Sequence, residues 1–415
     1  MPTVELRIES LAAGGDGVAR SDGLVVFVPR SAPGDVGDAD VRVKRNSRFA
    51  RAELRSLRVV SEDRVEARCR HYTRDRCGGC QLQHISYTAQ LEAKARIIGD
   101  AFERLGKLAV GAIRVRPSAL QWKYRRKLTL ALRHRETRNG TERIAGLRPF
   151  DDPASVFSLE ECPITNDAVL NIWRAILRAD SLLPDAPSMR GAVRVDGSAA
   201  TFHLEGGASW PAFETFMSAV PELNEVWWSP ARGTRQLMTD NDRRVDSGAS
   251  FLQVNAIVAA ELQRYVVERA MTYVPKHVID AYSGIGEVAS LLADTGVHIT
   301  AIELDADAAA ACGRRLPSGS CAIAGRVEEV LPRVLPADVV LLNPPRAGID
   351  QKVCVMLESV REVVRSVIYT SCDPATLARD VSRLPGYRVA RVEAFDMFPQ
   401  TAHVEIVCEL VPGGE

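Results

Sequence analysis

Hydrophobic and polar positions alternate in short runs over residues 1–58, and this pattern predicts a small β-barrel. The runs lie at 4–11, 24–28 and 39–44, and turn-forming clusters of glycine, proline and aspartate separate them at 13–17 and 33–35. Small barrels of the oligonucleotide-binding type hold single-stranded nucleic acid on a strand face. A barrel with a purely structural role fits the same pattern.

Residues 59–250 mix helix and strand signals. The second half of 83–106 places apolar residues in a stripe with charged intervals, as helices do, and 167–179 predicts another helix. Between them, 122–130 interleaves aromatic and basic side chains in a predicted strand, a combination suited to RNA. A basic edge strand without a ligand fits equally well.

From residue 251 to 415, apolar strand runs alternate with helical stretches. Strands are expected at 278–280, 299–303, 337–342 and 366–370, and helices at 288–293, 305–315 and 349–364. Such alternation indicates a doubly wound parallel sheet. The chain is therefore predicted to be an α/β protein of three parts, at 1–58, 59–250 and 251–415.

Composition narrows the class of protein. The 415 residues are 46% hydrophobic and 26% charged, which is typical of a soluble protein, and no run of 18 apolar residues predicts a membrane helix. The first residues lack the apolar core of a signal peptide, and nine cysteines without such a signal suggest a reducing cytoplasm. Neither a membrane nor an obligate protein partner is expected.

The formal net charge of zero conceals an asymmetry along the chain. Residues 1–148 carry 30 Lys and Arg against 17 Asp and Glu, whereas 149–415 carry 23 against 36. A basic first part favours a polyanionic partner, most simply nucleic acid, although a solvated basic face would give the same counts.

Cysteines provide two candidate sites. Cys69, Cys77, Cys80 and Cys162 have a spacing typical of a metal or cluster cage, and four thiolates suit either a [4Fe–4S] cluster or a zinc ion. Cys372 stands apart, directly after a predicted strand, where the active sites of parallel α/β sheets lie. An inert core thiol is the alternative at that position.

A glycine loop at 280–286 joins a predicted strand to a predicted helix, so its backbone N–H groups can approach a ligand. Glu303 ends the next strand, 23 residues after Asp280, where a carboxylate binds ribose hydroxyls. The loop lacks a third glycine at the dinucleotide spacing, which favours S-adenosylmethionine (SAM) over NAD. A purely structural turn is the alternative.

Five motifs then occur in order. They are Gly-Gly-Cys-Gln-Leu-Gln-His at 78–84, Phe-Leu-Gln-Val-Asn at 251–255, Leu-Asn-Pro-Pro-Arg-Ala-Gly at 342–348, Ser-Cys-Asp-Pro-Ala-Thr-Leu-Ala-Arg-Asp at 371–380 and Phe-Pro-Gln-Thr-Ala-His-Val-Glu at 398–405. With these motifs the sequence resembles the RNA 5-methyluridine methyltransferase family over nearly its whole length. It is most similar to the bacterial 23S rRNA enzymes that carry a TRAM domain and an iron–sulfur cluster. Residues 1–58 resemble the TRAM domain, an RNA-binding module.

The resemblance implies SAM-dependent C5-methylation of a specific uridine in 23S rRNA, presented single-stranded or flipped out. Cys372 would add to C6 of the base, and Glu405 would remove the C5 proton. The resemblance also implies that 83–113 packs on the methyltransferase domain. SAM would contact Gln253, Tyr282, Gly284, Glu303 and Asn343. A [4Fe–4S] cluster with a structural or RNA-ordering role would be held by Cys69, Cys77, Cys80 and Cys162.

Two positions depart from the family pattern. Asn343 stands where the family has Asp, and it creates an Asn-Pro-Pro sequence that resembles a motif of amino-methylating enzymes. Asp373 stands where the family has Asn, and its charge is expected to raise the pKa of Cys372 unless Arg346 or Arg379 offsets it. The alternatives are a tRNA uridine methyltransferase, a non-catalytic RNA-binding protein of ribosome assembly and an amino-group methyltransferase.

Overall fold

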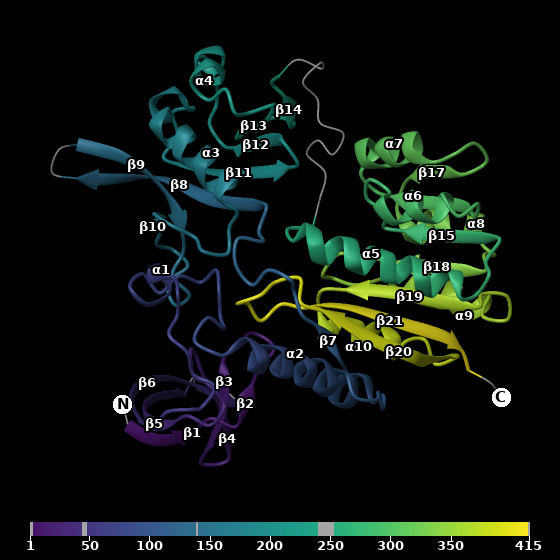
Figure 1. Cartoon of the computed structure of the whole chain (residues 1–415), viewed down its shortest axis with the longest axis horizontal. Helices are drawn as coiled ribbons and strands as arrows, with labels where there is room; N and C mark the ends of the chain where they lie inside the picture. Colours follow the sequence, from purple (N-terminus) through teal and green to yellow (C-terminus); the bar gives the residue numbers. More distant parts are fainter. Residues whose placement is uncertain (1–2, 44–47, 138–139, 240–252, 414–415) are drawn as a thin grey trace.

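The computed structural model of the chain describes residues 3–43, 48–137, 140–239 and 253–413. Three sheets follow one another along the sequence, as Figure 1 shows from purple to yellow. The expected division between residues 250 and 251, and Phe251 and Leu252 of the second motif, lie outside the described residues. Within the described residues, no helix is both long enough and apolar enough to cross a membrane.

The first sheet has six strands in the order β1-β5-β6-β4-β3-β2 and curls around its own core. Leu6, Val26, Val28 and Ala39 are among the buried residues of that core. The strand predicted at 24–28 is β4, so the strand-rich prediction for this region is confirmed. The strands are β1 (Thr3–Arg7), β2 (Ser10–Leu11), β3 (Gly17–Ser21), β4 (Leu24–Val28), β5 (Val36–Val43) and β6 (Phe49–Val59).

The second sheet has the order β10-β9-β8-β11-β12-β13-β14 and packs against α3 and α4. Trp173 on α3 meets Phe202 on β12 edge-on, with ring centroids 5.8 Å apart. The strands are β8 (Lys127–Thr137), β9 (Gly140–Leu147), β10 (Phe157–Ser158), β11 (Ser188–Asp196), β12 (Ala199–Glu205), β13 (Glu225–Ser229) and β14 (Gln236–Leu237). The helices are α1 (Arg70–Thr73), α3 (Asp167–Arg178), the short turn Asp180–Leu182 and α4 (Phe213–Ala219).

The strand predicted at 122–130 is wrong in its first half, because β8 begins only at Lys127. The backbone N–H groups of Lys123, Arg125 and Arg126 bond instead to the carbonyls of Pro163, Ile164 and Val254. The aromatic rings of this segment are also engaged within the protein. Tyr124 is buried and donates to the Pro399 carbonyl, and the Arg68 guanidinium lies 5.3 Å from the Trp122 ring centre. The segment ties the regions together rather than presenting an open stacking face.

The third sheet has the order β17-β16-β15-β18-β19-β21-β20-β7. It differs from the expected parallel sheet in one strand, because β21 runs antiparallel to both of its neighbours. The strands are β7 (Val115–Arg116), β15 (His277–Ala281), β16 (His298–Glu303), β17 (Cys321–Ala324), β18 (Val339–Leu342), β19 (Ser366–Ser371), β20 (Tyr387–Phe395) and β21 (Glu405–Pro412). The helices are α5 (Ala256–Met271), α6 (Glu287–Ala293), α7 (Ala306–Arg315), α8 (Val327–Val334), α9 (Gln351–Ser359) and α10 (Pro374–Val381).

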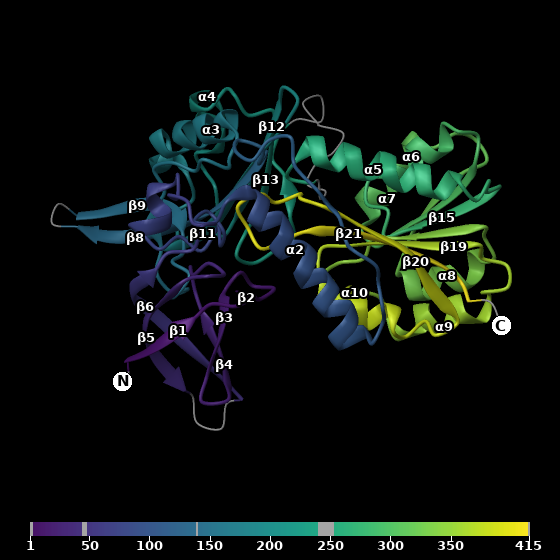
Figure 2. The same cartoon turned by 60° about the horizontal axis from the view of Figure 1, so that its bottom comes forward.

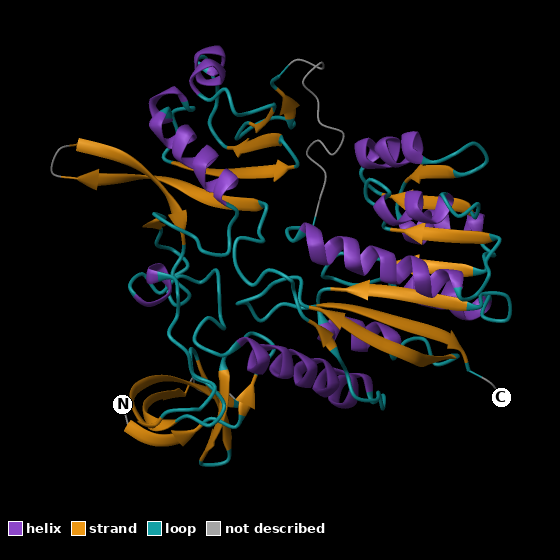
Figure 3. Ribbon diagram, in the orientation of Figure 1, coloured by secondary structure: helices purple, strands orange, loops and turns teal. Residues whose placement is uncertain are grey.

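Both faces of the third sheet are buried by helices (Figure 3). Successive residues of β18 alternate between two cores, with Val339 and Leu341 in the core of α5–α7 and Val340 and Leu342 in the core of α8–α10. A strand covered on both sides is apolar at every position, which explains the continuous apolar runs in the sequence.

The helix predicted within 83–106 is α2 (Tyr87–Ala101), followed by a short π-helical turn (Phe102–Gly106). Figures 1 and 2 both show α2 alongside α10, and its Ile98 shares a core with Leu377 of that helix. The short strand β7 pairs with β20 at the edge of the third sheet. Residues of the 83–113 segment therefore pack against the third sheet although the second sheet follows them in sequence.

Candidate active site and cysteine cage

Cys372 lies between the end of β19 and the start of α10, at the carboxyl edge of the parallel strands. Glu405 is the first residue of β21, the neighbouring strand. The register of the two strands pairs Ser371 with Ile406, so the next pair along brings Cys372 opposite Glu405. Glu405 is 4% exposed, whereas Cys372 is half-buried and open to a reactant.

Arg346 faces both of these groups. Burial raises the pKa of the Cys372 thiol, and the nearby Glu405 charge raises it further, whereas a hydrogen bond and the charge of Arg346 lower it. Burial raises the pKa of Glu405 to about 8, against the charge of Arg346 and a hydrogen bond with Gln253. A carboxyl group with a pKa near the working pH is well matched to accepting and releasing a proton.

Arg346 and Arg379, the two cations expected to lower the pKa of Cys372, have different contacts. Arg346 contacts the thiol, whereas Arg379 pairs with Asp380, its guanidinium 2.7 Å from the carboxylate. Asp373 caps α10, because its carboxylate accepts the backbone N–H of Thr376 at 2.7 Å. Glu405 is a carboxylate whose charge raises the pKa of Cys372, and the effect expected of Asp373 stays a prediction.

The glycine loop after β15 has the backbone of a ligand-binding turn. Tyr282, Gly284 and Gly286 all have positive φ angles, of 64°, 57° and 80°. A Cβ atom at Gly286 would lie 2.4 Å from the Cys312 sulfur, so only glycine fits there. A Cβ at Gly284 would meet nothing within 4 Å, so this part of the backbone is open. The loop is thus fixed on its inner side and accessible on its outer side.

Four of the five expected SAM contacts lie along one edge of the sheet. Glu303 ends β16 and accepts the Gly284 N–H at 2.8 Å, while its other oxygen accepts the Asp305 N–H at 2.9 Å. Asn343 follows β18, is exposed, and donates its backbone N–H to Ala281. Gln253 is the exception, because its side chain bonds to Glu405 rather than lying at the glycine loop. The sequence motifs contained Gln253 and Arg346 but did not indicate that Gln253 hydrogen-bonds to the candidate base or that the charge of Arg346 acts on it.

Four cysteines line one cavity of about 110 Å³ in the second region. All four thiols are free, and burial raises the pKa of each. The charge of Cys162 further raises the pKa of the other three, as close neighbours must. Nevertheless, no three His, Cys, Asp or Glu side chains within the described ranges are arranged around a single metal ion. The cysteines are Cys69, Cys77, Cys80 and Cys162.

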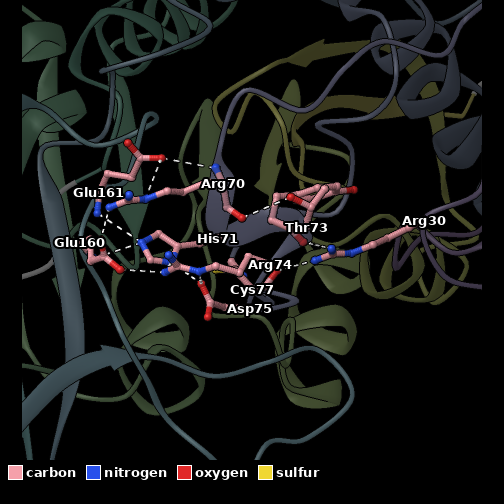
Figure 4. A network of polar contacts seen from close by, with 11 residues as sticks. Arg30, Arg70, His71, Thr73, Arg74, Asp75, Cys77, Glu160 and Glu161 are labelled. Carbon is pink, nitrogen blue, oxygen red and sulfur yellow. Dashed lines mark hydrogen bonds and ion pairs between the residues drawn. The ribbon is translucent and has the colours of Figure 1, made fainter.

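A buried histidine fixes two of the cysteine loops relative to each other (Figure 4). The Nδ1 of His71 lies 2.6 Å from Asp75, and its Nε2 accepts the backbone N–H of Glu160 at 3.0 Å and of Glu161 at 3.3 Å. Because Nε2 accepts, Nδ1 carries the proton and donates to Asp75. His71 follows Cys69 by two residues, and Glu160 precedes Cys162 by two, so this ring holds the two sides of the cage together.

A larger cavity of about 690 Å³ lies between the first sheet, the cysteine loop and the second sheet. Within the described part of the chain, Phe150 is the one aromatic residue that lines the cavity. Asp16 is its one acidic lining residue, and it pairs with Arg51 at 3.2 Å. The cavity is therefore strongly positive, and the five arginines that line it are Arg30, Arg51, Arg133, Arg148 and Arg190.

Comparisons with known proteins agree with this architecture. The profile of the tRNA (uracil-5-)-methyltransferase family matches residues 326–411, and that of the TRAM domain matches residues 2–54. An uncharacterized RNA methyltransferase of Protochlamydia amoebophila is 31% identical, with 98% of this chain and 97% of the relative covered. A second, of Gloeobacter violaceus, is 34% identical, with 98% and 96% covered. The chain belongs to the RNA uracil-5-methyltransferase family.

The family assignment makes the chain a SAM-dependent RNA methyltransferase with an amino-terminal TRAM domain. A solved structure supports the fold over the whole length. The tRNA (uracil-54, C5)-methyltransferase of Pyrococcus abyssi, in complex with S-adenosyl-L-homocysteine, superposes with a TM-score of 0.72 at 23% identity. The match covers 98% of this chain and 99% of that one.

Proposed function

We propose that this enzyme methylates C5 of a specific uridine in 23S rRNA, in the cytoplasm, with Cys372 as nucleophile and Glu405 as base. The observation that carries the proposal is a half-buried thiol that hydrogen-bonds to Arg346, at the end of a strand whose neighbour places the buried Glu405 carboxyl opposite it. Uracil C5 is a poor nucleophile, and addition of a thiolate at C6 makes it reactive.

Each of these groups has a defined part in the proposed reaction. The Cys372 sulfur forms a bond to C6, and the electron pair of the C5–C6 double bond moves into an enolate. Bound SAM supplies the methyl group that C5 then takes up. Glu405 accepts the C5 proton, the C5–C6 double bond re-forms, and the bond from sulfur to C6 breaks. Arg346 stabilises the thiolate before addition and after release.

For SAM, we propose contacts from Tyr282, Gly284, Glu303 and Asn343. Open backbone at Gly284 and the Glu303 carboxylate beside it suit the ribose and amino-acid parts of the cofactor. Gln253, which bonds to Glu405, would link the cofactor side of the pocket to the base.

For the RNA, we propose that the cavity lined by five arginines holds backbone phosphates near the flipped uridine. Arginines on three strands and two loops would neutralise several phosphates. Binding should therefore weaken steeply as salt rises.

We also propose that Cys69, Cys77, Cys80 and Cys162 hold a [4Fe–4S] cluster. Four free thiols around one cavity fit a four-cysteine group. Bound iron would keep the thiols ionised despite their raised pKa values. Anaerobically purified protein should be brown, absorb near ~400 nm and contain about four irons per chain. Stoichiometric zinc without iron would contradict the cluster.

The substrate is tested by incubating the purified enzyme with labelled SAM and with rRNA or tRNA from cells that lack it. Chromatography of the digested nucleosides should give 5-methyluridine from 23S rRNA only. Product from tRNA would favour the second candidate, a tRNA uridine methyltransferase, which the TM-score of 0.72 to a tRNA enzyme keeps open. Failure to bind SAM in calorimetry would indicate a non-catalytic RNA-binding protein.

The covalent step has its own test. RNA containing 5-fluorouridine cannot lose a proton from C5, so the adduct between Cys372 and C6 should persist. A band that survives denaturation and carries both RNA and methyl label is expected for the parent enzyme. Its absence alongside normal turnover of natural RNA would exclude this mechanism.

A further inference from the structure

The segment 396–404, which leads into Glu405, is held by the middle of α2. Lys94 and Asp396 are both fully buried and form an ion pair of 2.5 Å, and the same ammonium donates to the Phe398 carbonyl at 3.1 Å. Tyr87 donates to the other Asp396 oxygen at 2.7 Å. These contacts fix the start of the segment. Other residues hold its last turn, which contains Gln400.

Gln400, in that last turn, has a strained backbone. Its φ is 70°, a left-handed conformation that residues other than glycine rarely adopt. Gln90 of α2 holds it from one side, since it accepts the Gln400 N–H at 3.0 Å and donates to its side-chain oxygen at 3.0 Å. From the other side, the Gln400 carbonyl accepts the N–H groups of Gln81 at 3.2 Å and Leu82 at 3.0 Å.

The Gln81 side chain bridges two loops. Its Nε2 donates to the Gly78 carbonyl at 2.9 Å, inside the turn between Cys77 and Cys80. Its Oε1 accepts the Ala402 N–H at 3.3 Å, three residues before Glu405. The Gln81 amide group thus connects the Cys77–Cys80 turn to the turn that precedes Glu405.

The TRAM domain packs against Gln81 and Ala402. Gly15 lies in a turn of the first region, and a Cβ atom there would lie 2.7 Å from the Gln81 Cβ and 3.2 Å from the Ala402 Cβ. A larger residue would push Gln81 and Ala402 apart. All three regions of the molecule therefore meet at Gln81.

We propose that Gln81 is a positioning residue that couples the order of the Cys77–Cys80 turn to the placement of Glu405. Gln81 also lines the cavity of the five arginines, and its effect on Glu405 acts through the Ala402 backbone. The inference rests on the proposed role of Glu405 as base. It gives the cysteine cage a function in methyl transfer without any redox step.

Two variants separate the ends of the bridge. Gln81→Leu keeps the bulk but loses both hydrogen bonds, whereas Gln81→Glu keeps an oxygen for the Ala402 N–H and sets a second, repelling oxygen against the Gly78 carbonyl. Hydrogen exchange of the Ala402 amide, measured by NMR or mass spectrometry on the full chain, should rise about three- to tenfold in Gln81→Leu and by a smaller factor in Gln81→Glu, whose remaining connection no longer includes the cysteine turn. Gln263→Leu, which removes another half-buried glutamine bonded to Glu287, should leave the Ala402 amide unchanged.

Turnover should follow the same pattern. Gln81→Leu should lower kcat about tenfold and change the KM for RNA much less, and Gln81→Glu should lower kcat by a smaller factor. Coupling to the cage is measured by a double-mutant cycle, in which Cys77→Ser speeds Ala402 exchange in the parent but adds nothing in Gln81→Leu. If Cys77→Ser proves unfolded by circular dichroism, the two Gln81 variants alone decide.

An Ala402 amide and a kcat that are both unchanged in Gln81→Leu would overturn the inference. Additive effects of Gln81→Leu and Cys77→Ser would overturn the coupling. The exchange measurement needs no turnover. A parent enzyme without 5-methyluridine product would therefore refute the proposed function while the Ala402 exchange still tests the positioning of the turn.

Discussion

The cysteine cage and the Cys372 site both contain buried thiols, but their surroundings differ in charge. In the cage, burial raises the pKa values of the thiols and their neighbouring thiols raise them further, with Cys77 reaching about 11. At Cys372, burial and Glu405 raise the pKa, and a direct contact with Arg346 works against them. The charges of Arg30 and Arg125 oppose this rise at Cys77 and Cys162, whereas Arg346 also hydrogen-bonds to Cys372. The proposed metal would add further positive charge at the cage.

The difference indicates how one chain can hold structural and reactive thiols. A group of sulfurs bound to metal is stable and inert, while a single thiol beside a guanidinium is nucleophilic when ionised. Variants at the Cys372 site should therefore lower activity, whereas variants at the cage should lower stability.

Removing the reactive sulfur should have the largest effect. Cys372→Ala is expected to lower kcat at least about 10⁴-fold, since no other group can form the bond to C6. Affinities for SAM and RNA, measured by calorimetry and filter binding, should change little. Cys354→Ala, at a buried thiol of α9 outside both sites, is the matched control and should retain activity. Substantial turnover by Cys372→Ala would refute the nucleophile assignment.

Removing a cage sulfur should act on stability instead. Cys80→Ser is expected to lose bound iron and to lower the free energy of unfolding by at least about 2 kcal/mol, because metal binding contributes to folding. Iron analysis and urea unfolding measure the two effects. Iron content and stability equal to those of the parent would show that Cys80 is not a ligand.

Removing the cation should make Cys372 resemble a cage thiol without its metal. Arg346→Gln should raise the pKa values of both Cys372 and Glu405, lower the rate at pH 7 about 10- to 100-fold, and shift the rising limb of the pH–rate profile upward. Arg346→Lys, which keeps the charge, should recover part of the loss. A pH profile identical to the parent's in Arg346→Gln would contradict this role.

Neutralising the base should change how stability depends on pH. Because burial raises the Glu405 pKa to about 8, the folded state favours its neutral form. Its contribution to stability is therefore full below the unfolded pKa and is lost as pH rises towards 8. Glu405→Gln lacks this loss and should be more stable than the parent at pH 8 by about 1–3 kcal/mol, with little difference at pH 4. Urea unfolding at both pH values measures it, and parallel pH dependences would contradict the raised pKa.

The smallest effect is expected at Asn343. Asn343→Asp adds a charge near the proposed sulfonium, but the position is exposed, so the gain in SAM affinity should stay below about tenfold. The product should remain 5-methyluridine. An N-methylated nucleoside from the parent enzyme would instead favour an amino-group target, for which Cys372 and Glu405 have no use.

Local pattern predicted most secondary structure. The run at 24–28 is β4, the helix predicted at 167–179 is α3, and the helix predicted at 305–315 is α7, because each pattern arises from residues close in sequence. The prediction at 122–126 was wrong because the backbone there bonds to Pro163, Ile164 and Val254, which are distant in sequence. The helix predicted at 349–364 ends early, at Ser359.

The sequence by itself determined which residues are candidates for the chemistry: the four clustered cysteines, the glycine loop with Glu303, and Cys372 and Glu405 within their motifs. The tertiary structure decided how they act together. The antiparallel insertion of β21 beside β19 brings Glu405 opposite Cys372, and the fold turns Arg346 rather than Arg379 towards the thiol. Spacing along a chain specifies local periodicity, whereas a pKa depends on the distances and burial that only long-range strand pairing creates.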